Sequence, residues 1–181
     1  MRKIHRLLSS CRRGYFKYLY LCTLNHKIRK IRRKETIRVL FAVAESATWK
    51  NDSLYRAMLM HPGFTPLILV LPDEQKEESL KREGVDTCFD FFRNKGYTCS
   101  YPYENGKLIN IRKALNPDII FYQKPYTYYP ESFLYRRNLN ALFCYTNYAF
   151  HSLLADWANK NDFFQLVWQN YYCLLYTSPS P

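Results

Sequence analysis

A group of aromatic and charged residues follows the first apolar segment of the chain and has the chemistry to bind a polar ligand. The group contains Trp49, Lys50, Asp52 and Tyr55. An aromatic ring, a cation and a carboxylate at one edge of a sheet suit a polyol or a sugar phosphate, which is bound by stacking and by hydrogen bonds. In a purely structural interpretation, Asp52 or Ser53 caps a helix and the two rings pack in the core. The sequence leaves both interpretations open.

Among the histidines, His151 is the best placed for acid–base chemistry. It follows a predicted strand in the stretch YTNYAFHS, whereas the others belong to a basic arm or precede a proline. An imidazole in a loop at a strand end could take a proton from an attacking hydroxyl. No carboxylate stands near it in sequence to orient the ring, so a structural role for His151 stays open.

A second candidate loop follows the apolar run from Asp118 to Tyr122. The stretch 116–130, NPDIIFYQKPYTYYP, begins with a chain-breaking Asn-Pro pair and ends in a loop rich in tyrosine. Ligands of open α/β sheets lie beyond the carboxyl ends of such strands. The candidates to line a cleft are therefore Lys124, Pro125, Tyr126 and Tyr129. A packed connection with surface tyrosines is the alternative interpretation.

Common phosphate- and metal-binding motifs are absent from the sequence. The five glycines form neither G-x-G-x-x-G nor a P-loop, and there is no G-x-S-x-G, H-E-x-x-H or D-x-D. The six cysteines form no C-x-x-C pair and have no histidine at zinc spacing. The sequence therefore predicts no metal site and identifies no cofactor.

The excess positive charge is confined to residues 1–34. This arm holds 12 Lys or Arg and no Asp or Glu, whereas the rest of the chain holds 15 residues of each sign, from totals of 27 basic and 15 acidic. An apolar stripe at helical spacing runs along the arm. The stripe consists of Ile4, Leu7, Leu8, Cys11, Tyr15, Tyr18, Leu19 and Cys22.

A basic helix with an apolar stripe predicts an arm that lies on an anionic membrane surface. The predicted membrane contacts are Ile4, Leu7, Leu8, Arg12, Arg13, Lys30, Arg32 and Arg33. A nucleic-acid-binding arm needs no apolar stripe, which disfavours nucleic acid as the partner. A helix packed on the body and a solvated run of charge are the alternatives. No run of 18 apolar residues occurs, so no membrane-spanning helix is expected.

Apolar segments alternate with helical segments from residue 35 to residue 172. Strands are predicted within 35–45, 66–71, 97–101, 118–122 and 141–146, with a last helix at Phe164–Tyr171. The helical region after Pro72-Asp73 is expected to break at Gly84, and Asn105-Gly106 predicts a turn. This alternation predicts one α/β domain, with a Rossmann-like parallel sheet and helices on both faces.

The last segment, residues 173–181, reads CLLYTSPSP and resembles the translation of a sequencing-library adapter. We therefore expect a non-native tail, and a natural chain that continues beyond about Tyr172. An ordinary flexible tail is the alternative.

Four blocks of the body together resemble a known family. They are IRVLFAVAESATWKNDSLYRAM, FDFFRNKGY, NPDIIFYQKPYTYYP and LFCYTNYAFH. They are similar to the amino-terminal half of the CDP-glycerol glycerophosphotransferases, the family of the teichoic-acid primases and polymerases. The resemblance implies a two-domain glycosyltransferase-B architecture whose first domain faces the acceptor and whose second binds the CDP-glycerol donor. It also implies peripheral attachment to the cytoplasmic face of the cell membrane.

The implied reaction is transfer of glycerol phosphate from CDP-glycerol to a hydroxyl of a polyol, a sugar or a lipid-linked acceptor. By this resemblance the cleft-facing positions are Trp49, Asp52, Tyr126, Tyr148 and His151. The donor-binding domain is expected beyond this chain, which alone should be inactive. A nucleotide-sugar-dependent glycosyltransferase for surface polysaccharide and a non-catalytic membrane-docking module are the alternative functions.

Overall fold

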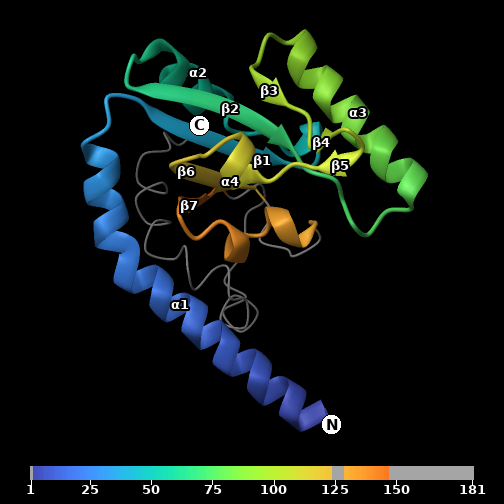
Figure 1. Ribbon diagram of the computed structural model, residues 1–181. Helices are drawn as coiled ribbons and strands as arrows, with labels where there is room; N and C mark the ends of the chain where they lie inside the picture. Colours follow the sequence, from blue (N-terminus) through green and yellow to red (C-terminus); the bar gives the residue numbers. More distant parts are fainter. Residues whose placement is uncertain (1, 124–128, 147–181) are drawn as a thin grey trace, which may run out of the picture.

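Five parallel strands form the central sheet of the computed structural model, which describes residues 2–123 and 129–146. They are β1 (Ile37–Val43), β2 (Phe64–Val70), β3 (Cys99–Ser100), β6 (Ile119–Tyr122) and β7 (Leu142–Tyr145). The strand order is β3-β2-β1-β6-β7 (Figure 1). The predicted α/β, Rossmann-like parallel sheet is confirmed, and each strand overlaps the apolar segment that predicted it.

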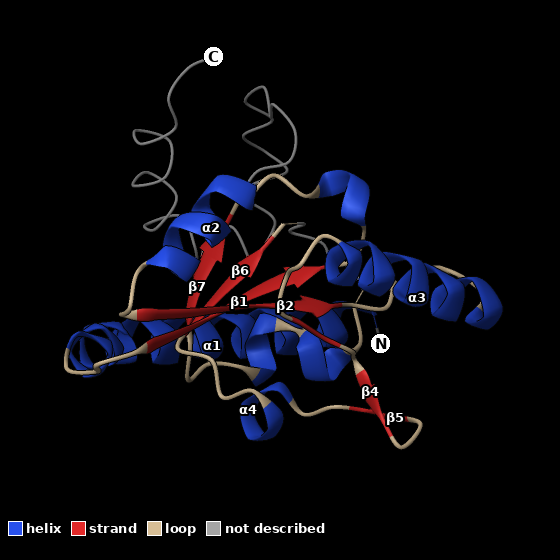
Figure 2. Ribbon diagram, turned by 90° about the horizontal axis from the view of Figure 1, so that it is seen from above, coloured by secondary structure: helices blue, strands red, loops and turns tan. Residues whose placement is uncertain are grey.

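Helices cover both faces of the sheet, as Figure 2 shows. They are α1 (Arg2–Arg32), α2 (Asp52–Met60), α3 (Glu78–Asn94) and α4 (Ile111–Ala114). Successive residues of a strand point to opposite faces. Phe41 of β1 therefore packs with residues of α2 and α3, whereas Leu40 packs with residues of α1 and α4. This burial on both faces explains why β1 is a continuous apolar run.

Two local expectations need correction. Gly84 does not break the helical region, because α3 runs through it; one glycine costs a helix only about 1 kcal/mol relative to alanine. The N-cap residue of α2 is Asn51, and Asp52 is the first residue of the helix. Between β6 and β7, the chain forms two short 3-10 turns, η2 (Glu131–Phe133) and η3 (Tyr135–Arg137).

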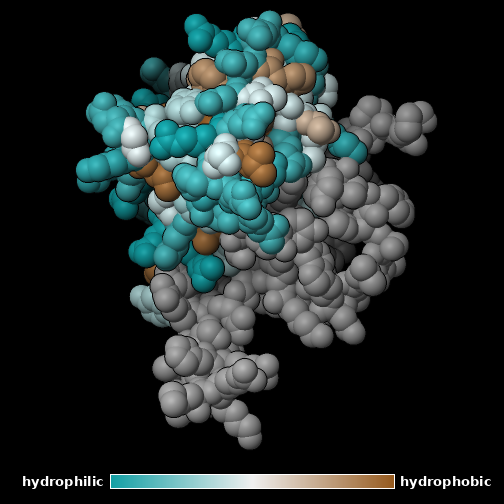
Figure 3. Space-filling model, turned by 90° about the vertical axis from the view of Figure 1, so that its right-hand side faces the viewer, coloured by the Kyte–Doolittle hydropathy of each residue, from teal (hydrophilic) through white to brown (hydrophobic). Residues whose placement is uncertain are grey.

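The predicted turn at Asn105-Gly106 is confirmed and joins a small hairpin that the sequence did not predict. Its strands are β4 (Tyr103–Glu104) and β5 (Lys107–Leu108). Asn105 and Gly106 have φ values of 51° and 73°, the left-handed pair that a tight hairpin turn requires. In Figure 3, the coloured part of the surface is mostly hydrophilic, with small separate hydrophobic areas.

The carboxyl-terminal half of α1 packs on the sheet. The Tyr20 side chain is fully buried, stacks on Phe143 of β7 at 5.0 Å between ring centroids, and accepts a hydrogen bond from the Phe143 backbone N–H at 3.1 Å. Lys27 and Ile31 lie on the same side of the helix and are buried too. After the helix, Lys34 Nζ donates to Asp118 Oδ1 at 2.6 Å. The arm and the sheet therefore share one core from Tyr20 onward.

Of the predicted apolar stripe, the structure describes the side chains of Tyr15, Tyr18, Leu19 and Cys22. At 3.6 residues per turn, the positions of Tyr15 and Tyr18 are nearly opposite to those of Tyr20 and Lys27, and Leu19 lies to the side. Tyr15 and Tyr18 are 62% and 69% exposed, and Leu19 is exposed as well. In Figure 1 the amino-terminal half of α1 extends away from the strands. The docked face and the exposed face are thus different faces of one helix.

Candidate functional site

A switch point in the sheet lies between β1 and β6. The chain moves outward from β1 to β2 and β3, and then returns to the other side of β1 for β6 and β7. At such a point the connections after the two neighbouring strands diverge, and ligands of open α/β sheets bind beyond the carboxyl ends of these strands. The candidate site is therefore the edge formed by the segments that follow β1, β6 and β7.

The centre of this edge is Gln123, the residue directly after β6. Its side chain is 2% exposed, and its Oε1 lies 3.2 Å from the hydroxyl of Thr48 in the turn η1 (Ser46–Thr48). The same hydroxyl lies 2.9 Å from the carbonyl oxygen of Glu45. A hydroxyl has a single proton, so Thr48 can donate to only one of these two oxygens.

The carboxamide of Gln123 is incompletely paired. With Oε1 toward Thr48, the buried Nε2 has no partner. If Thr48 instead donates to Glu45, the amide can turn over so that Nε2 donates to Thr48. A buried polar atom without a partner costs about 1–3 kcal/mol, so such an atom in a native fold calls for an explanation.

Two more buried polar atoms at this edge have no hydrogen-bond partner. One is Thr146 Oγ1, directly after β7, and the other is Asn51 Nδ2, in the segment between β1 and α2. Tyr122 pairs with Tyr145 in the sheet, so Gln123 and Thr146 occupy neighbouring positions on adjacent strands. By the alternation of the strands, both lie on the face that α2 covers.

A charged pair lies at the same edge. Glu45 follows β1, and its Oε1 is 3.9 Å from Nζ of Lys76 in the segment after β2. Both side chains are solvent-accessible, so their mutual attraction is weak. Within residues 2–123 and 129–146, no three His, Cys, Asp or Glu side chains are grouped as a metal site would require.

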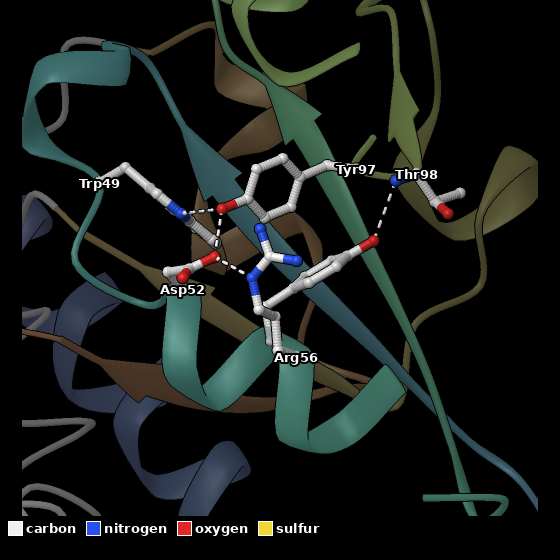
Figure 4. A network of polar contacts seen from close by, with 6 residues as sticks. Trp49, Asp52, Arg56, Tyr97 and Thr98 are labelled. Carbon is white, nitrogen blue, oxygen red and sulfur yellow. Dashed lines mark hydrogen bonds and ion pairs between the residues drawn. The ribbon is translucent and has the colours of Figure 1, made fainter. Parts of the chain in front are cut away.

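The side chains of Trp49 and Asp52, two of the predicted site residues, both form hydrogen bonds with the hydroxyl of Tyr97. Tyr97 Oη accepts a hydrogen bond from Trp49 Nε1 at 3.2 Å and donates one to Asp52 Oδ1 (Figure 4). Arg56 Nε donates to the same carboxylate oxygen at 2.8 Å, and its guanidinium lies over the Tyr97 ring. The indole also packs against Phe41.

These contacts give Asp52 a stabilised negative charge. The Tyr97 hydroxyl is the largest influence lowering the pKa of Asp52, and Arg56 lowers it further. Burial raises the pKa of Tyr97, and the neighbouring Asp52 carboxylate raises it more. Asp52 is therefore ionised at neutral pH, and its Oδ1 accepts hydrogen bonds from Tyr97 and Arg56. Trp49 packs as its structural interpretation predicts, whereas Asp52 pairs with Tyr97 and Arg56 and does not cap the helix.

The other predicted site residues fall in different places. Tyr129 is buried in the core beside β6 and β7, so its assignment to a cleft lip is wrong. Lys30, Arg32 and Arg33 are exposed on or just after α1. Lys124, Pro125, Tyr126, Tyr148 and His151 lie outside the described residues, as do the side chains of Ile4, Leu7, Leu8, Arg12 and Arg13.

Sequence reasoning missed Thr48, Gln123 and Thr146 as site residues. No motif marks them, because each is a single neutral polar residue in a turn or directly after an apolar strand. The available signal was weak: polar residues directly after buried strands lie at the edge where ligands bind. That polar atoms of Gln123 and Thr146 are buried without a partner is a property of the folded chain alone.

Comparison of the chain with family models, curated proteins and solved structures gave no match. The relationship to the CDP-glycerol glycerophosphotransferases therefore stays a prediction. Within the described part of the chain, no helix is both long enough and apolar enough to cross a membrane.

Proposed function

We propose that this chain is the acceptor-side domain of a CDP-glycerol glycerophosphotransferase that transfers glycerol phosphate to a hydroxyl of a polyol, a sugar or a lipid-linked acceptor. The observation that carries the proposal is the position of Gln123, Thr48 and Thr146 at the switch point of a parallel sheet. That edge is where this class of sheet binds ligands, and its unpaired polar atoms are suited to a polar substrate. The blocks of sequence quoted above add the reaction type.

In the proposed reaction, the acceptor oxygen attacks the phosphorus atom that carries the glycerol. The bond between this phosphorus and the oxygen of CMP breaks, CMP leaves, and the proton of the acceptor hydroxyl passes to a base. His151 is the predicted base. Catalysis of this kind depends on positioning the two substrates and on stabilising charge at the phosphoryl oxygens. The groups that bind the donor are expected in a second domain beyond this chain.

We further propose that α1 attaches the protein to the cytoplasmic face of the cell membrane. The face of α1 away from the sheet carries exposed Tyr15, Tyr18 and Leu19, and the arm of residues 1–34 has 12 basic residues and no acidic one. Exposed apolar and aromatic side chains on a basic helix suit an anionic lipid surface. The helix can remain docked on the sheet while this face contacts lipid.

The test is a CMP-release assay on the intact gene product, with CDP-glycerol as donor and a polyol as acceptor. We expect CMP release that requires the acceptor, and we expect His151→Ala to lower turnover more than donor binding. Nucleotide release from a sugar donor alone would point to the alternative glycosyltransferase. If no donor is consumed, the chain is better explained as a non-catalytic membrane-docking module.

A further inference from the structure

The helices on the two sides of the sheet differ in charge. On one side, α1 contains ten basic residues and α4 contains two, and neither helix has an acidic residue. On the other side, α2 has one basic and one acidic residue, and α3 has three basic and four acidic ones. In Figure 2, α1 and α4 lie below the strands and α2 lies above them.

We propose that the side of the domain formed by α1 and α4 lies on an anionic lipid surface, with Arg112 and Lys113 of α4 as a second contact beside α1. This rests on the proposed attachment of α1 to the membrane and extends it to a surface that the sequence did not indicate. α4 is far from α1 in sequence, but Ile111 of α4 and Tyr20 of α1 belong to one buried cluster.

The first step is that the carboxyl end of α1 lies close to α4. Lys34, two residues after the end of α1, donates from Nζ to Asp118 Oδ1 at 2.6 Å, and Asp118 is four residues beyond the end of α4. The backbone N–H of Arg38 donates to Asp118 Oδ2 at 3.1 Å, which holds this carboxylate at the start of β1. The last turn of α1 and the helix α4 are therefore neighbours on one side of the sheet.

The second step is the direction of the basic side chains. Two residues along an α-helix turn the side-chain direction by about 200°. Arg29 is two residues from both Lys27 and Ile31, which are buried against the sheet, so it points away from the sheet. Lys113 is two residues from Ile111, which is 1% exposed, so it points outward as well. Arg29, Arg112 and Lys113 are all exposed.

The third step is that these charges are not neutralised. Arg29, Arg112 and Lys113 form no ion pair within residues 2–123 and 129–146. On the other side of the sheet, Arg56 of α2 and Lys81 of α3 both pair with carboxylates. An anionic lipid surface attracts unpaired basic side chains, and each one near the surface strengthens binding about fivefold. The exposed Tyr15 and Tyr18 of α1 add the aromatic contact with lipid.

The experiment measures binding of the full 181-residue chain to vesicles of phosphatidylcholine and phosphatidylglycerol by co-sedimentation. We expect the double variant Arg112→Gln, Lys113→Gln to bind about 25-fold more weakly, fivefold for each charge removed. The double variant Arg93→Gln, Lys95→Gln removes two exposed charges at the end of α3 and is the matched control. It should bind within about twofold of the wild type, because salt screens charges that lie across the domain from the lipid.

A second measurement needs no substitution. Acetic anhydride at low concentration modifies exposed lysines, and mass spectrometry reads the rate at each position. Anionic vesicles should slow the modification of Lys113 several-fold and leave that of Lys95, which is exposed beyond α3, unchanged. Vesicles of phosphatidylcholine alone should protect neither lysine. Equal modification of Lys113 with and without anionic vesicles would overturn the proposal.

The outcomes separate this contact from the proposed attachment of α1. The α4 contact is overturned if its variant binds as the wild type does, or if the α3 control loses as much. Loss in Tyr18→Glu alone would keep the attachment of α1 and remove the contact of α4, and no binding by the full chain would remove both. Binding to duplex DNA that exceeds binding to vesicles, and that is lost in the α4 variant, would assign this side to nucleic acid. The CMP-release assay is independent of all these results.

Discussion

The hydroxyl of Tyr97 joins two side chains that come from different parts of the α2 region. It accepts from Trp49 and donates to Asp52, whose carboxylate also binds Arg56. We expect Tyr97→Phe to lower the free energy of unfolding by about 1 kcal/mol, because two hydrogen bonds are lost while the ring remains. Urea denaturation measures the change. Tyr103→Phe is the control, since the Tyr103 ring is covered by Arg82 and its hydroxyl has no hydrogen bond within the described residues.

The same substitution has a defined pH dependence. The lowered pKa of Asp52 means that its interactions stabilise the fold above the ordinary carboxyl pKa of about 4. This contribution is lost as the pH falls through the lower folded-state value. The stability difference between wild type and Tyr97→Phe should therefore shrink below about pH 4. A difference that is constant from pH 7 to the acid transition would mean that Asp52 is not the important acceptor.

At the level of elements, α1 carries a buried charge on its docked face. Lys27 is 8% exposed, its Nζ lies 4.1 Å from the centroid of the Tyr20 ring, and this ammonium has no hydrogen-bond partner. Burial lowers the pKa of Lys27 from 10.5 to about 8. The ring attracts the cation, but this attraction does not fully replace its hydration. The docking of α1 is therefore weaker than an apolar side chain at position 27 would allow.

We expect Lys27→Met to raise the free energy of unfolding at pH 7 by about 1 kcal/mol, an amount discounted for partial solvation of the ammonium. Between about pH 8 and pH 10.5 the unfolded wild type holds more protons than the folded one, so wild-type stability gains as the pH rises. The advantage of the methionine variant should shrink across this window. Lys30→Met, at an exposed position of the same helix, is the control. A variant less stable than wild type at pH 7 would contradict this account.

The opposite face of α1 can be tested separately. Tyr18 is on the exposed stripe, and Tyr18→Glu places a negative charge where lipid contact is proposed. We expect the binding of the full chain to anionic vesicles to fall roughly tenfold, because the apolar contact is lost and the new charge is repelled. Ser53→Glu makes the same charge change on α2 and should leave binding intact. Equal loss in both variants would show attraction by net charge alone, without an oriented helix.

The elements also show which features the sequence could predict. The strands were predictable because β1, β2 and β6 are apolar runs bounded by polar or chain-breaking residues. The order of the strands could not be predicted, because it depends on contacts between distant segments, such as Val39 with Ile119. The residues of α1 that pack on the sheet were not identified from the sequence, because this second face begins only at Tyr20 and includes Lys27. The helical periodicity identified the other stripe, in which Tyr15 and Tyr18 are exposed, because apolar and charged residues separate clearly there.

The position of the candidate site could be predicted from the sequence, but the residues that form it could not. The rule that ligands bind beyond carboxyl strand ends points, from the predicted strands alone, to the edge where the structure has buried polar atoms without partners. The residues it suggested were conspicuous ones: Trp49 packs beside Phe41, and Tyr129 is buried in the core. A tyrosine suits either environment, because its ring is apolar and its hydroxyl is polar.

At the scale of the whole molecule, the neutral body and the basic arm overlap in one helix. The sequence placed a boundary at residue 34, where the charge changes, whereas the buried side chains of α1, among those described, begin at Tyr20. Tyr20 is in the same buried cluster as Phe143 of β7 and Ile111 of α4. Because the carboxyl-terminal half of α1 is part of the core, the whole helix has a fixed orientation relative to the sheet.

Two truncations test this division. Removal of residues 1–17 should leave the fold intact, because it ends before the buried Tyr20. Removal of residues 1–32 should lower the free energy of unfolding by at least about 3 kcal/mol, the usual cost of deleting one large aromatic side chain from a core. It also removes the hydroxyl that pairs the Phe143 backbone N–H. Urea denaturation and nitrogen-15 NMR spectra measure both effects. If the shorter chain unfolds at the same urea concentration as the full one, the packed half of α1 contributes nothing to the core, and the arm is a separate unit up to residue 34.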